Sequence, residues 1–552
     1  DSYAPYEQVM VHNMRRRFAP DGGRPCDMAF PYFNMAGPGG GVILAIGWTG
    51  QWSAFFQRNS DKDLRITAGQ ELTRFYLKPG EEVRSPLMVL LFWKGEDAVR
   101  SQNLWRRWML AHNVPRQLGD KPLRPILTYC TFGTLRWGNN NEQIEKFFID
   151  ELTKQEALPD YWWMDAGWFP GGQGQWMVDR DRFPNGLKAI SDYVHQRNMG
   201  LIAWFEPESA YPWSITARSN PNALLKTPPD PSGQYIVNLG EPTARQWLTD
   251  RLDRLLREEG IDVYRQDINM APLNRWRAND PPDRQGITEN LHVQGYLALW
   301  DELLRRNPNL WIDSCAGGGR RNDLETLRRA VPLLRSDYQE FSGHPSWDNG
   351  NQGHTYGIAS WFPYFGHNLM FNPQQPFYQA RSYMSPAFGI QFDIRKYKMD
   401  WDLYRRLIRQ WRQVADCYLG DYYPLTPYSL LSTDWMAWQF HRPDQNDGMV
   451  QAFRREQCDR DSLRIGLRGL EPDAIYTLAN LDLPGTTEMA GRELMGDGLA
   501  IVIRDLPGSA IISYKKTRGQ GNQQRRRQDA HWRFEPGKLS GPLLGRRSPS
   551  PR

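Results

Sequence analysis

The stretch Asp262-Val263-Tyr264-Arg265-Gln266-Asp267-Ile268-Asn269 has the pattern of a short buried strand. Its apolar and aromatic residues suit the interior of a sheet, and the strand delivers a carboxylate, Asp267, at its end. Taken alone, an aspartate at the end of a strand more often forms a turn or caps the next helix. The meaning of Asp267 therefore depends on the segments around it.

Strand-like and helical segments alternate on both sides of this stretch. Strands are predicted at 126–132, 161–168, 201–208, 263–268, 310–314, 333–337, 361–365 and 386–392. Such alternation indicates a parallel sheet with helical crossovers, and this number of units favours closure into a (β/α)8 barrel of the TIM type over an open sheet.

The segments on either side of the barrel have a different texture, with short β-like runs between Gly, Pro and charged turns. The sequence therefore predicts a multidomain chain of α/β and β type. Its parts are an N-terminal β-sandwich at 1–96, a helical linker at 97–123, the barrel at 124–424, a small C-terminal β-sandwich at 425–514 and a basic, disordered tail at 515–552. The first residues enter the N-terminal sandwich midway, so we expect its beginning to be missing through truncation or processing.

The net charge of +5 over 552 residues is concentrated at one end. Residues 515–552 hold eleven Lys or Arg against two Asp or Glu, so the rest of the chain is slightly acidic. This distribution argues against a nucleic-acid partner. The sequence contains no run of eighteen apolar residues, so no membrane span is expected. We expect a soluble protein, whose compartment, cytoplasmic or exported, the sequence leaves open.

Several kinds of site are not indicated. The five cysteines are scattered without a C-x-x-C pair, and histidines do not cluster with carboxylates, so no metal site is expected. No G-x-G-x-x-G turn, P-loop or G-x-S-x-G elbow is present, which argues against a nucleotide cofactor and a serine triad. The sequence predicts a site that works without a cofactor.

Carboxylates instead recur where the predicted barrel strands end, which is where such barrels carry their functional side chains. They are Asp165, Glu206, Glu208, Asp267, Asp313 and Asp337. Cleavage of a glycosidic bond requires two carboxyl groups, one ionised to attack or stabilise the anomeric carbon and one protonated for the leaving oxygen. The 23 tryptophans suit contacts with the apolar faces of sugars, although ordinary core packing explains most of them. The pattern favours a glycosidase.

Five motifs in this region also resemble a known family. They are Tyr161-Trp-Trp-Met-Asp165-Ala-Gly-Trp168, Trp204-Phe-Glu-Pro-Glu208, Tyr264-Arg-Gln-Asp267-Ile-Asn269, Asp313-Ser-Cys-Ala-Gly-Gly-Gly319 and Arg335-Ser-Asp337. In this order they are similar to the α-galactosidases of glycoside hydrolase family 36, over residues 104–424. The family's layout, with a sandwich ahead of the barrel, also fits.

The resemblance implies a retaining reaction in which Asp267 is the nucleophile that forms a covalent glycosyl-enzyme. Asp337 would be the acid that protonates the leaving oxygen and later the base that activates water. The carboxylates Glu206 and Glu208 would have supporting roles, with Glu206 the runner-up for catalysis.

The same resemblance implies a set of substrate-binding residues. Asp165 would accept hydrogen bonds from the sugar's O4 and O6, and Cys315 with the backbone of Gly318 would lie near O2. The set is completed by Trp168, Trp204 and Arg265.

Three positions depart from the family's pattern. Ala166 stands where many members have a second aspartate, Arg265 replaces a lysine, and Ser232 lies where an arginine is often seen. Arginine presents a planar fork of donors instead of a point charge, so the contact with the sugar cannot be identical. These changes concern the choice of sugar more than the type of reaction.

The leading prediction is a retaining, exo-acting α-galactosidase that hydrolyses terminal α-linked galactose in an oligosaccharide or glycoside. The alternatives within the family are an α-N-acetylgalactosaminidase, another α-glycosidase or a transglycosylase. A different class, an inactive carbohydrate-binding barrel, also fits the motifs. The resemblance makes a homo-oligomer possible.

Overall fold

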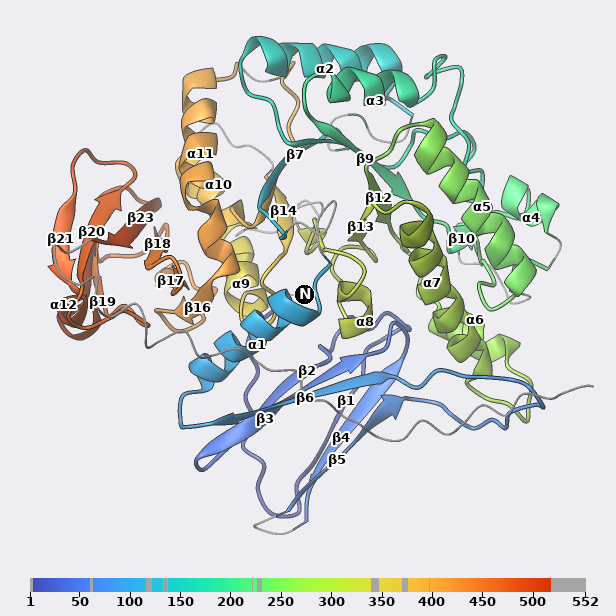
Figure 1. Cartoon of the computed structure of the whole chain (residues 1–552), viewed down its shortest axis with the longest axis horizontal. Helices are drawn as coiled ribbons and strands as arrows, with labels where there is room; N and C mark the ends of the chain where they lie inside the picture. The colour runs from blue at the N-terminus through green and yellow to red at the C-terminus, as the bar shows by residue number, and fades with distance from the viewer. Residues whose placement is uncertain are drawn as a thin grey trace, which may run out of the picture.

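The computed structural model describes residues 3–59, 63–115, 122–132, 135, 138–220, 222–225, 231–338, 347–369, 376–396 and 398–517. Three parts follow one another along the chain: an N-terminal pair of sheets, a ring of parallel strands with helices outside, and a C-terminal β domain (Figure 1). This arrangement confirms the predicted fold class. The predicted tail lies outside the described residues from 518 onward.

The N-terminal part contains two antiparallel three-stranded sheets. One orders its strands β1-β4-β5 and the other β2-β3-β6. The bounds are β1 (Arg15–Phe18), β2 (Tyr32–Gly37), β3 (Gly40–Gly47), β4 (Trp52–Arg58), β5 (Leu64–Gln70) and β6 (Leu87–Lys94). Phe33 of one sheet packs on Phe56 of the other, with ring centroids 4.8 Å apart. Aromatic side chains therefore join the two sheets.

Helix α1 (Ala98–His112) begins at Asp97, whose side chain accepts hydrogen bonds from two backbone N–H groups of the first turn. Its Arg106 is fully buried and donates to four backbone carbonyls, those of residues 359, 362, 418 and 420. Those carbonyls would otherwise lack partners in the interior. The segment predicted as a linker is thus fixed against the barrel and the start of the C-terminal sheet.

Seven parallel strands form the barrel sheet, in the order β13-β12-β9-β8-β7-β15-β14. Their bounds are β7 (Ile126–Cys130), β8 (Tyr161–Met164), β9 (Gly200–Phe205), β12 (Val263–Gln266), β13 (Trp311–Ser314), β14 (Gly366–Leu369) and β15 (Ala387–Ile390). Every residue of β7, β8 and β12 is buried, as expected for a parallel sheet covered on both faces.

Residues 331–335 close the ring between β13 and β14. The N–H of Val331 donates to Ile312 O, and Ser314 donates back to Val331 O. On the other side, Gly366 N donates to Pro332 O and Arg335 N donates to Gly366 O. The predicted strand at 333–337 is therefore an irregular segment, in part because Pro332 has no N–H to give to a ladder. The predicted strand at 361–365 is wrong: the strand β14 begins only at Gly366.

Helices surround the sheet (Figure 1). They are α2 (Glu142–Lys154), α3 (Lys188–His195), α5 (Pro242–Glu258), α6 (Leu273–Asn279), α7 (Ile287–Arg306), α8 (Leu324–Leu327), α9 (Trp347–Ile358), α10 (Pro376–Tyr383) and α11 (Trp401–Val414). A short pair, β10 (Ser209–Ala210) and β11 (Tyr235–Ile236), and the helix α4 (Ile215–Ser219) lie between β9 and α5. Among the described residues, no helix is both long and apolar enough to cross a membrane.

The C-terminal part is a β domain with a hydrophobic core of its own. Its main sheet has the order β16-β17-β18-β23-β20-β21, and β19 pairs with β22. The bounds are β16 (Asp421–Pro424), β17 (Trp435–Arg442), β18 (Asp447–Arg454), β19 (Ser462–Ile465), β20 (Ile475–Asn480), β21 (Thr487–Ala490), β22 (Leu499–Val502) and β23 (Gly508–Lys516). The main sheet thus begins at Asp421, four residues before the predicted start of this domain at residue 425. It ends at Lys516, two residues after the predicted end at residue 514.

Glu289, at the start of α7, connects the barrel to the N-terminal sheets. One of its oxygens, Oε1, accepts hydrogen bonds from Trp48 Nε1 and Gln51 N, both at 2.7 Å. The side chain is buried, and this burial raises its pKa from 4.5 to about 8, although the two hydrogen bonds oppose the shift. The folded protein therefore holds a proton here that the unfolded chain releases above its ordinary pKa.

This linkage predicts how stability changes with pH. Because the folded-state pKa is raised, the stability that this proton contributes is complete below pH 4.5 and is lost as the pH rises from 4.5 through about 8. We expect Glu289→Gln, which keeps the acceptor oxygen but never ionises, to match the wild type near pH 5 and to melt at a higher temperature than it near pH 9. Thermal unfolding across this pH range tests the expectation. The control Glu258→Gln, at an exposed position of α5, should follow the wild type at every pH, and a Glu289→Gln variant that did so too would contradict the linkage.

Candidate active site

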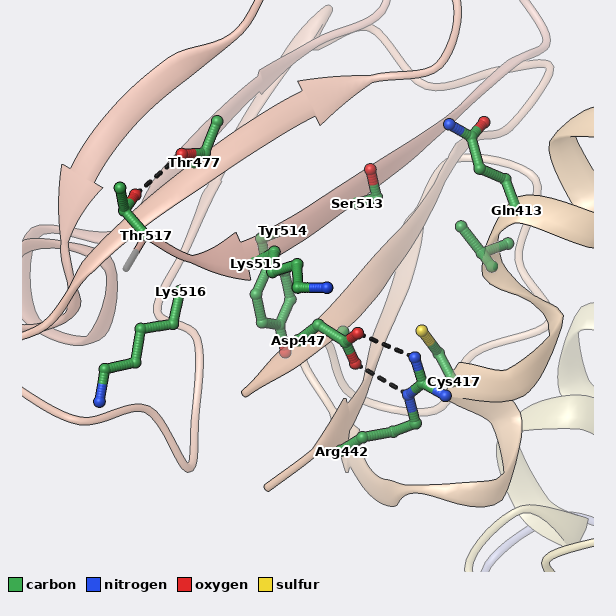
Figure 2. Close-up of a pocket in the computed structure, with 12 residues that line it drawn as sticks. Gln413, Cys417, Arg442, Asp447, Thr477, Ser513, Tyr514, Lys515, Lys516 and Thr517 are labelled. Atoms are coloured by element: carbon green, nitrogen blue, oxygen red, sulfur yellow. Dashed lines mark hydrogen bonds and ion pairs between the residues drawn. The ribbon is translucent and has the colours of Figure 1, made fainter. Parts of the chain in front are cut away.

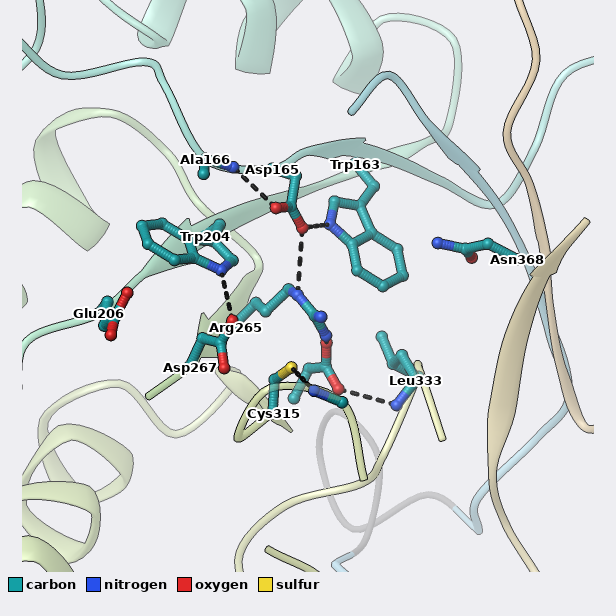
Figure 3. A network of polar contacts seen from close by, with 12 residues as sticks. Trp163, Asp165, Ala166, Trp204, Glu206, Arg265, Asp267, Cys315, Leu333 and Asn368 are labelled. Atoms are coloured by element: carbon teal, nitrogen blue, oxygen red, sulfur yellow. Dashed lines mark hydrogen bonds and ion pairs between the residues drawn. The ribbon is translucent and has the colours of Figure 1, made fainter. Parts of the chain in front are cut away.

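Four carboxylates converge where neighbouring barrel strands end. Asp165 follows β8, Glu206 follows β9, Asp267 follows β12, and Asp313 lies within β13. Parallel strands present their carboxyl ends at one edge of the sheet, so the four acids meet there. Figure 3 shows Asp165 and Asp267 beside the side chain of Arg265, with Glu206 farther away from it.

Arg265 is buried between two of these acids. Its Nε lies 3.2 Å from Asp165 Oδ2, and its Nη1 contacts Asp313 Oδ2. Arg265 stands opposite Asp313 in the register of β12 and β13, and its guanidinium lies 4.5 Å from the ring centroid of Trp163. Burial raises the pKa of both Asp165 and Asp313, and the charge of Arg265 opposes this shift. The predicted sugar contact is thus also the counter-charge of the site.

Asp267 is held by four N–H donors. Its Oδ1 accepts from Ile268 N at 2.7 Å and from Gly317 N at 2.8 Å. Its Oδ2 accepts from Asn269 Nδ2 at 3.1 Å and from Trp204 Nε1 at 3.3 Å. Asp267 is 6% exposed, and these four donors fix the orientation of its carboxylate.

The loop 315–319 touches both acids of the predicted catalytic pair. Gly317 donates to Asp267, and a Cβ on Gly318 would lie 2.7 Å from the backbone nitrogen of Asp337. Gly318 has φ +82°, a left-handed conformation that glycine adopts without strain. Burial raises the pKa of the Cys315 thiol well above its ordinary value; Arg265 opposes this, and Asp267 and Asp337 add to it. The structure therefore brings Cys315 and Gly318 to the two acids, and Asp337 itself is half-buried.

Glu206 lies beside Asp267. Its Oε1 accepts from Asn269 N at 2.8 Å, and its Oε2 accepts from Asn269 Nδ2 at 3.1 Å and Gln173 Nε2 at 3.3 Å. Burial, followed by the negative charge of Asp267, raises the pKa of Glu206 to about 7. Glu206 therefore holds its proton more tightly than an ordinary glutamate does, directly next to the predicted nucleophile.

Glu208 is bound on all sides and is part of the scaffold. It accepts from Gln266 Nε2 at 2.8 Å, from two nitrogens of Arg321 and from His292 Nε2 at 3.1 Å. Burial alone would raise its pKa, but Arg321 and His292 outweigh it and bring the pKa to about 2. The charge stays inside this cluster, which fits the supporting role predicted for Glu208.

The two tryptophans predicted to bind substrate lie in different surroundings. Trp204 points its N–H at Asp267 and stacks on Phe169, with ring centroids 5.9 Å apart and planes at 11°. Trp168 is fully buried and donates to the backbone carbonyl of Trp204 at 2.9 Å. The structure thus brings Trp204 to the site and places Trp168 behind it.

Two residues close to the acids were missed by the sequence reasoning. Asn269 bridges Asp267 and Glu206, and Gln173 extends the contact outward from Glu206. Asn269 stands two residues after Asp267, on the loop that begins there, so its position was a usable signal. Gln173 lies in a glycine-rich loop far from any motif, and no pattern singled it out.

A separate cavity of about 460 Å³ lies between the end of α11 and the C-terminal sheet (Figure 2). Arg442 and Asp447 line it and pair with each other through two hydrogen bonds of 2.8 Å. Their charges are already satisfied within the domain, so we assign the pair to its structure.

Comparison with known proteins places these observations in context. A family model described as Melibiase matches residues 98–340, and one described as the C-terminal domain of glycosyl hydrolase family 36 matches residues 435–511. Alpha-galactosidase 1 of Pediococcus pentosaceus is 27% identical over 417 residues, which cover 72% of this chain and 56% of that protein. An alpha-galactosidase of Lactobacillus acidophilus is 26% identical over 312 residues, or 53% of this chain and 41% of that protein. The chain thus spans about half the length of these curated relatives.

Solved structures show the same fold. The alpha-galactosidase of Lactobacillus brevis superposes with a TM-score of 0.81 at 18% identity, covering 94% of this chain and 72% of that one. A variant of an alpha-galactosidase of Geobacillus stearothermophilus, solved in complex with stachyose, gives a TM-score of 0.79 at 20% identity and covers 92% and 72%. At these identities the likeness concerns the fold.

The bridge formed by Asn269 yields a testable prediction. Asn269→Asp places a third carboxylate between Asp267 and Glu206 with almost no change of shape, and like charges at this distance disfavour ionisation. We expect the acidic limb of the pH profile of glycoside turnover to move upward by about one pH unit. The control Asn269→Ala removes the same donor without adding charge, so it should lower turnover and move the limb upward by clearly less than Asn269→Asp does. An unshifted limb in Asn269→Asp would contradict the coupling.

Proposed function

The chain belongs to glycoside hydrolase family 36, and from this premise we propose that it is a retaining, exo-acting α-galactosidase. It would hydrolyse terminal α-linked galactose by two successive displacements. The proposal draws on the names of its relatives and on the acids assembled at the barrel end.

The first displacement would use both acids at once. Asp267 attacks the anomeric carbon, while Asp337 transfers its proton to the glycosidic oxygen, so that the C–O bond breaks and the leaving sugar departs as an alcohol. In the second step Asp337 takes a proton from water, the resulting hydroxide oxygen bonds to the anomeric carbon, and Asp267 is released. The configuration is retained because the carbon is inverted twice.

One observation carries the proposal: the loop 315–319 contacts both acids. Gly317 fixes Oδ1 of Asp267, and Gly318 packs against the backbone of Asp337. The backbone donors hold Oδ1 at 2.7 and 2.8 Å, whereas the side-chain donors lie 3.1 and 3.3 Å from Oδ2. The less tightly bound Oδ2 is therefore our candidate for the attacking oxygen.

Substrate binding would involve the groups around this pair. We propose that Asp165, Trp204 and Arg265 contact the galactose, with Cys315 and the backbone of Gly318 near O2. The fully buried Trp168 would act indirectly, by holding the backbone of Trp204 through its 2.9 Å hydrogen bond.

An α-N-acetylgalactosaminidase is the alternative, and it depends on residues that differ from the family's pattern. Ala166 and Arg265 are the residues that leave this choice of sugar undecided. A third residue, the small Ala316 of the Asp313–Gly319 motif, could also be taken to favour this alternative, but it gives no support because it is fully buried among Ile268, Met270 and Leu273. Turnover of matched 4-nitrophenyl α-galactoside and α-N-acetylgalactosaminide separates the two activities.

The two acids should respond differently to substitution. Asp267→Ala removes the group that forms the covalent intermediate, so we expect kcat on 4-nitrophenyl α-galactoside to fall by about 10⁴-fold or more. Asp337→Ala should impair natural oligosaccharides strongly but spare substrates with good leaving groups in the first step, because these need little protonation.

Sodium azide provides a further readout for the second acid. A small nucleophile does not need the base, so azide should restore turnover of an activated galactoside by Asp337→Ala and yield α-galactosyl azide. Equal losses on all leaving groups, without azide rescue, would assign the acid–base role elsewhere.

Arg265→Lys tests the clamp between the two buried acids. An ammonium group lacks the two-pronged geometry needed to reach Asp165 and Asp313 together, which leaves one acid without its counter-charge. We expect a loss of stability of about 3 kcal/mol and a clear loss of kcat/KM on galactosides. The control Arg257→Lys, at an exposed arginine of α5 that pairs with Asp253, should leave both quantities almost unchanged. Wild-type melting and turnover by Arg265→Lys would show that the fork is dispensable.

A further inference from the structure

A groove beside the acids has no role in the reaction described above. It has a volume of about 710 Å³, within the range of ligand pockets. Loops after β8, β9 and β12 supply its walls, and we call it the outer groove, with the lining residues Gly172, Gln173, Tyr211, Trp213, Gln234 and Asn269. Glu206 also lines it, so the groove opens directly beside the predicted nucleophile.

Two aromatic rings form one wall of the outer groove. Tyr211 and Trp213 stack with ring centroids 4.3 Å apart and planes at 20°. Trp213 is 53% exposed, an unusual position for so large an apolar side chain in a chain whose other tryptophans are mostly buried. Scattered exposed apolar residues need no explanation, but a stacked pair that lines a cavity does.

The surrounding backbone holds this pair in place. The short strands β10 and β11 tie the segment before Tyr211 to the one before Val237, and Tyr211 N donates to Gln173 O at 3.2 Å. A Cβ on Gly172 would lie 2.6 Å from a ring carbon of Tyr211, so the backbone of the loop after β8 packs directly against that ring. The wall is therefore built into the fold and is not a loosely attached loop tip.

A chain of hydrogen bonds runs from the aromatic wall to the acids. Gln234 Nε2 donates to Tyr211 Oη and to Gln173 Oε1, each at 3.3 Å. Gln173 Nε2 then donates to Glu206, whose next neighbour is Asn269. The groove thus combines flat apolar faces with amide and carboxyl groups.

This composition selects a class of ligand. Aromatic faces pack on the C–H faces of pyranose rings, while amides and carboxylates bind hydroxyl groups. Among the described residues that line the groove there is no Lys or Arg, so a phosphate or carboxylate ligand would lack a counter-charge. A neutral sugar fits all of these features.

We propose that the outer groove binds a second sugar ring of an oligosaccharide substrate, with Trp213 as its stacking platform. The inference rests on the proposed α-galactosidase function, because it assigns the terminal galactose to the acids and the following part of the same molecule to the groove. Trp213 thereby makes the enzyme prefer oligosaccharides to simple galactosides.

The test compares a substrate that reaches the groove with one that does not. The trisaccharide raffinose carries further rings, whereas α-galactosyl fluoride has a single-atom leaving group. We expect Trp213→Ala to raise KM for the trisaccharide about tenfold and to leave the kinetics on the fluoride unchanged. Trp213→Phe, which keeps a flat ring, should retain most of the preference.

The control is Phe92→Ala, at a 77% exposed aromatic residue of β6 in the N-terminal sheets, which should behave like the wild type on both substrates. Equal effects of Trp213→Ala on the two substrates, or no effect on either, would overturn the inference while leaving the proposed function intact.

Binding without turnover separates the two proposals further. In Asp267→Ala, calorimetric titration with raffinose measures affinity directly, and adding Trp213→Ala should weaken it about tenfold. If the wild type hydrolysed neither substrate, the proposed function would fail, and the titration would still decide the groove: an unchanged affinity in the double variant would overturn it.

Discussion

The site depends on one buried cation. Arg265 carries its charge into the barrel from β12 and meets Asp165 beyond β8 and Asp313 on β13. Removing ions from water is costly, and a buried acid left without its partner destabilises a protein by about 3–5 kcal/mol. The guanidinium offsets this cost for two acids at once because its nitrogens lie in a fixed plane. The ion pairs thereby fix the positions of the ends of β8, β12 and β13 relative to one another before any ligand binds.

The loop 315–319 connects the strand that carries Asp313 to both acids of the predicted catalytic pair. Asp313 lies one residue before the end of β13, the strand from which this loop departs, and its Oδ1 accepts from Leu333 N at 2.8 Å, in the segment that closes the barrel. That segment leads to Asp337. Asp267 and Asp337 are thus connected through three neighbouring features: the ion pairs of Arg265, the loop 315–319 and the closing segment 331–335. An irregular closing segment is tolerated here because its backbone groups bond to β13 and β14 on both sides.

The sequence predicted most of the barrel because its strands are short runs of uniformly buried residues between amphipathic helices. It failed at β14, whose His367 and Asn368 are polar and yet fully buried, so hydrophobicity gives no strand signal there. The acids were found through their place after the strands. The sequence did not reveal that Arg265 holds Asp165 and Asp313 together, because both partners lie more than forty residues away in the chain. Tyr211 and Trp213 escaped notice because an aromatic pair in a loop has no period to detect.

Counting acceptor sites sharpens what Asp165 can do for a sugar. A carboxylate offers about four lone-pair positions. The Oδ1 of Asp165 accepts from Ala166 N at 2.9 Å, and its Oδ2 accepts from Trp163 Nε1 at 2.9 Å and faces Arg265 Nε at 3.2 Å. The Arg265 contact is an ion pair without a hydrogen bond, so one position is left on each oxygen and Asp165 has room for two hydroxyl donors. With Ala166 providing no second carboxylate, these two positions are the acceptors that we propose for O4 and O6 of the sugar. We therefore expect the choice of sugar to depend on the donors already bound to Asp165 as well as on the residues that replace the family's pattern.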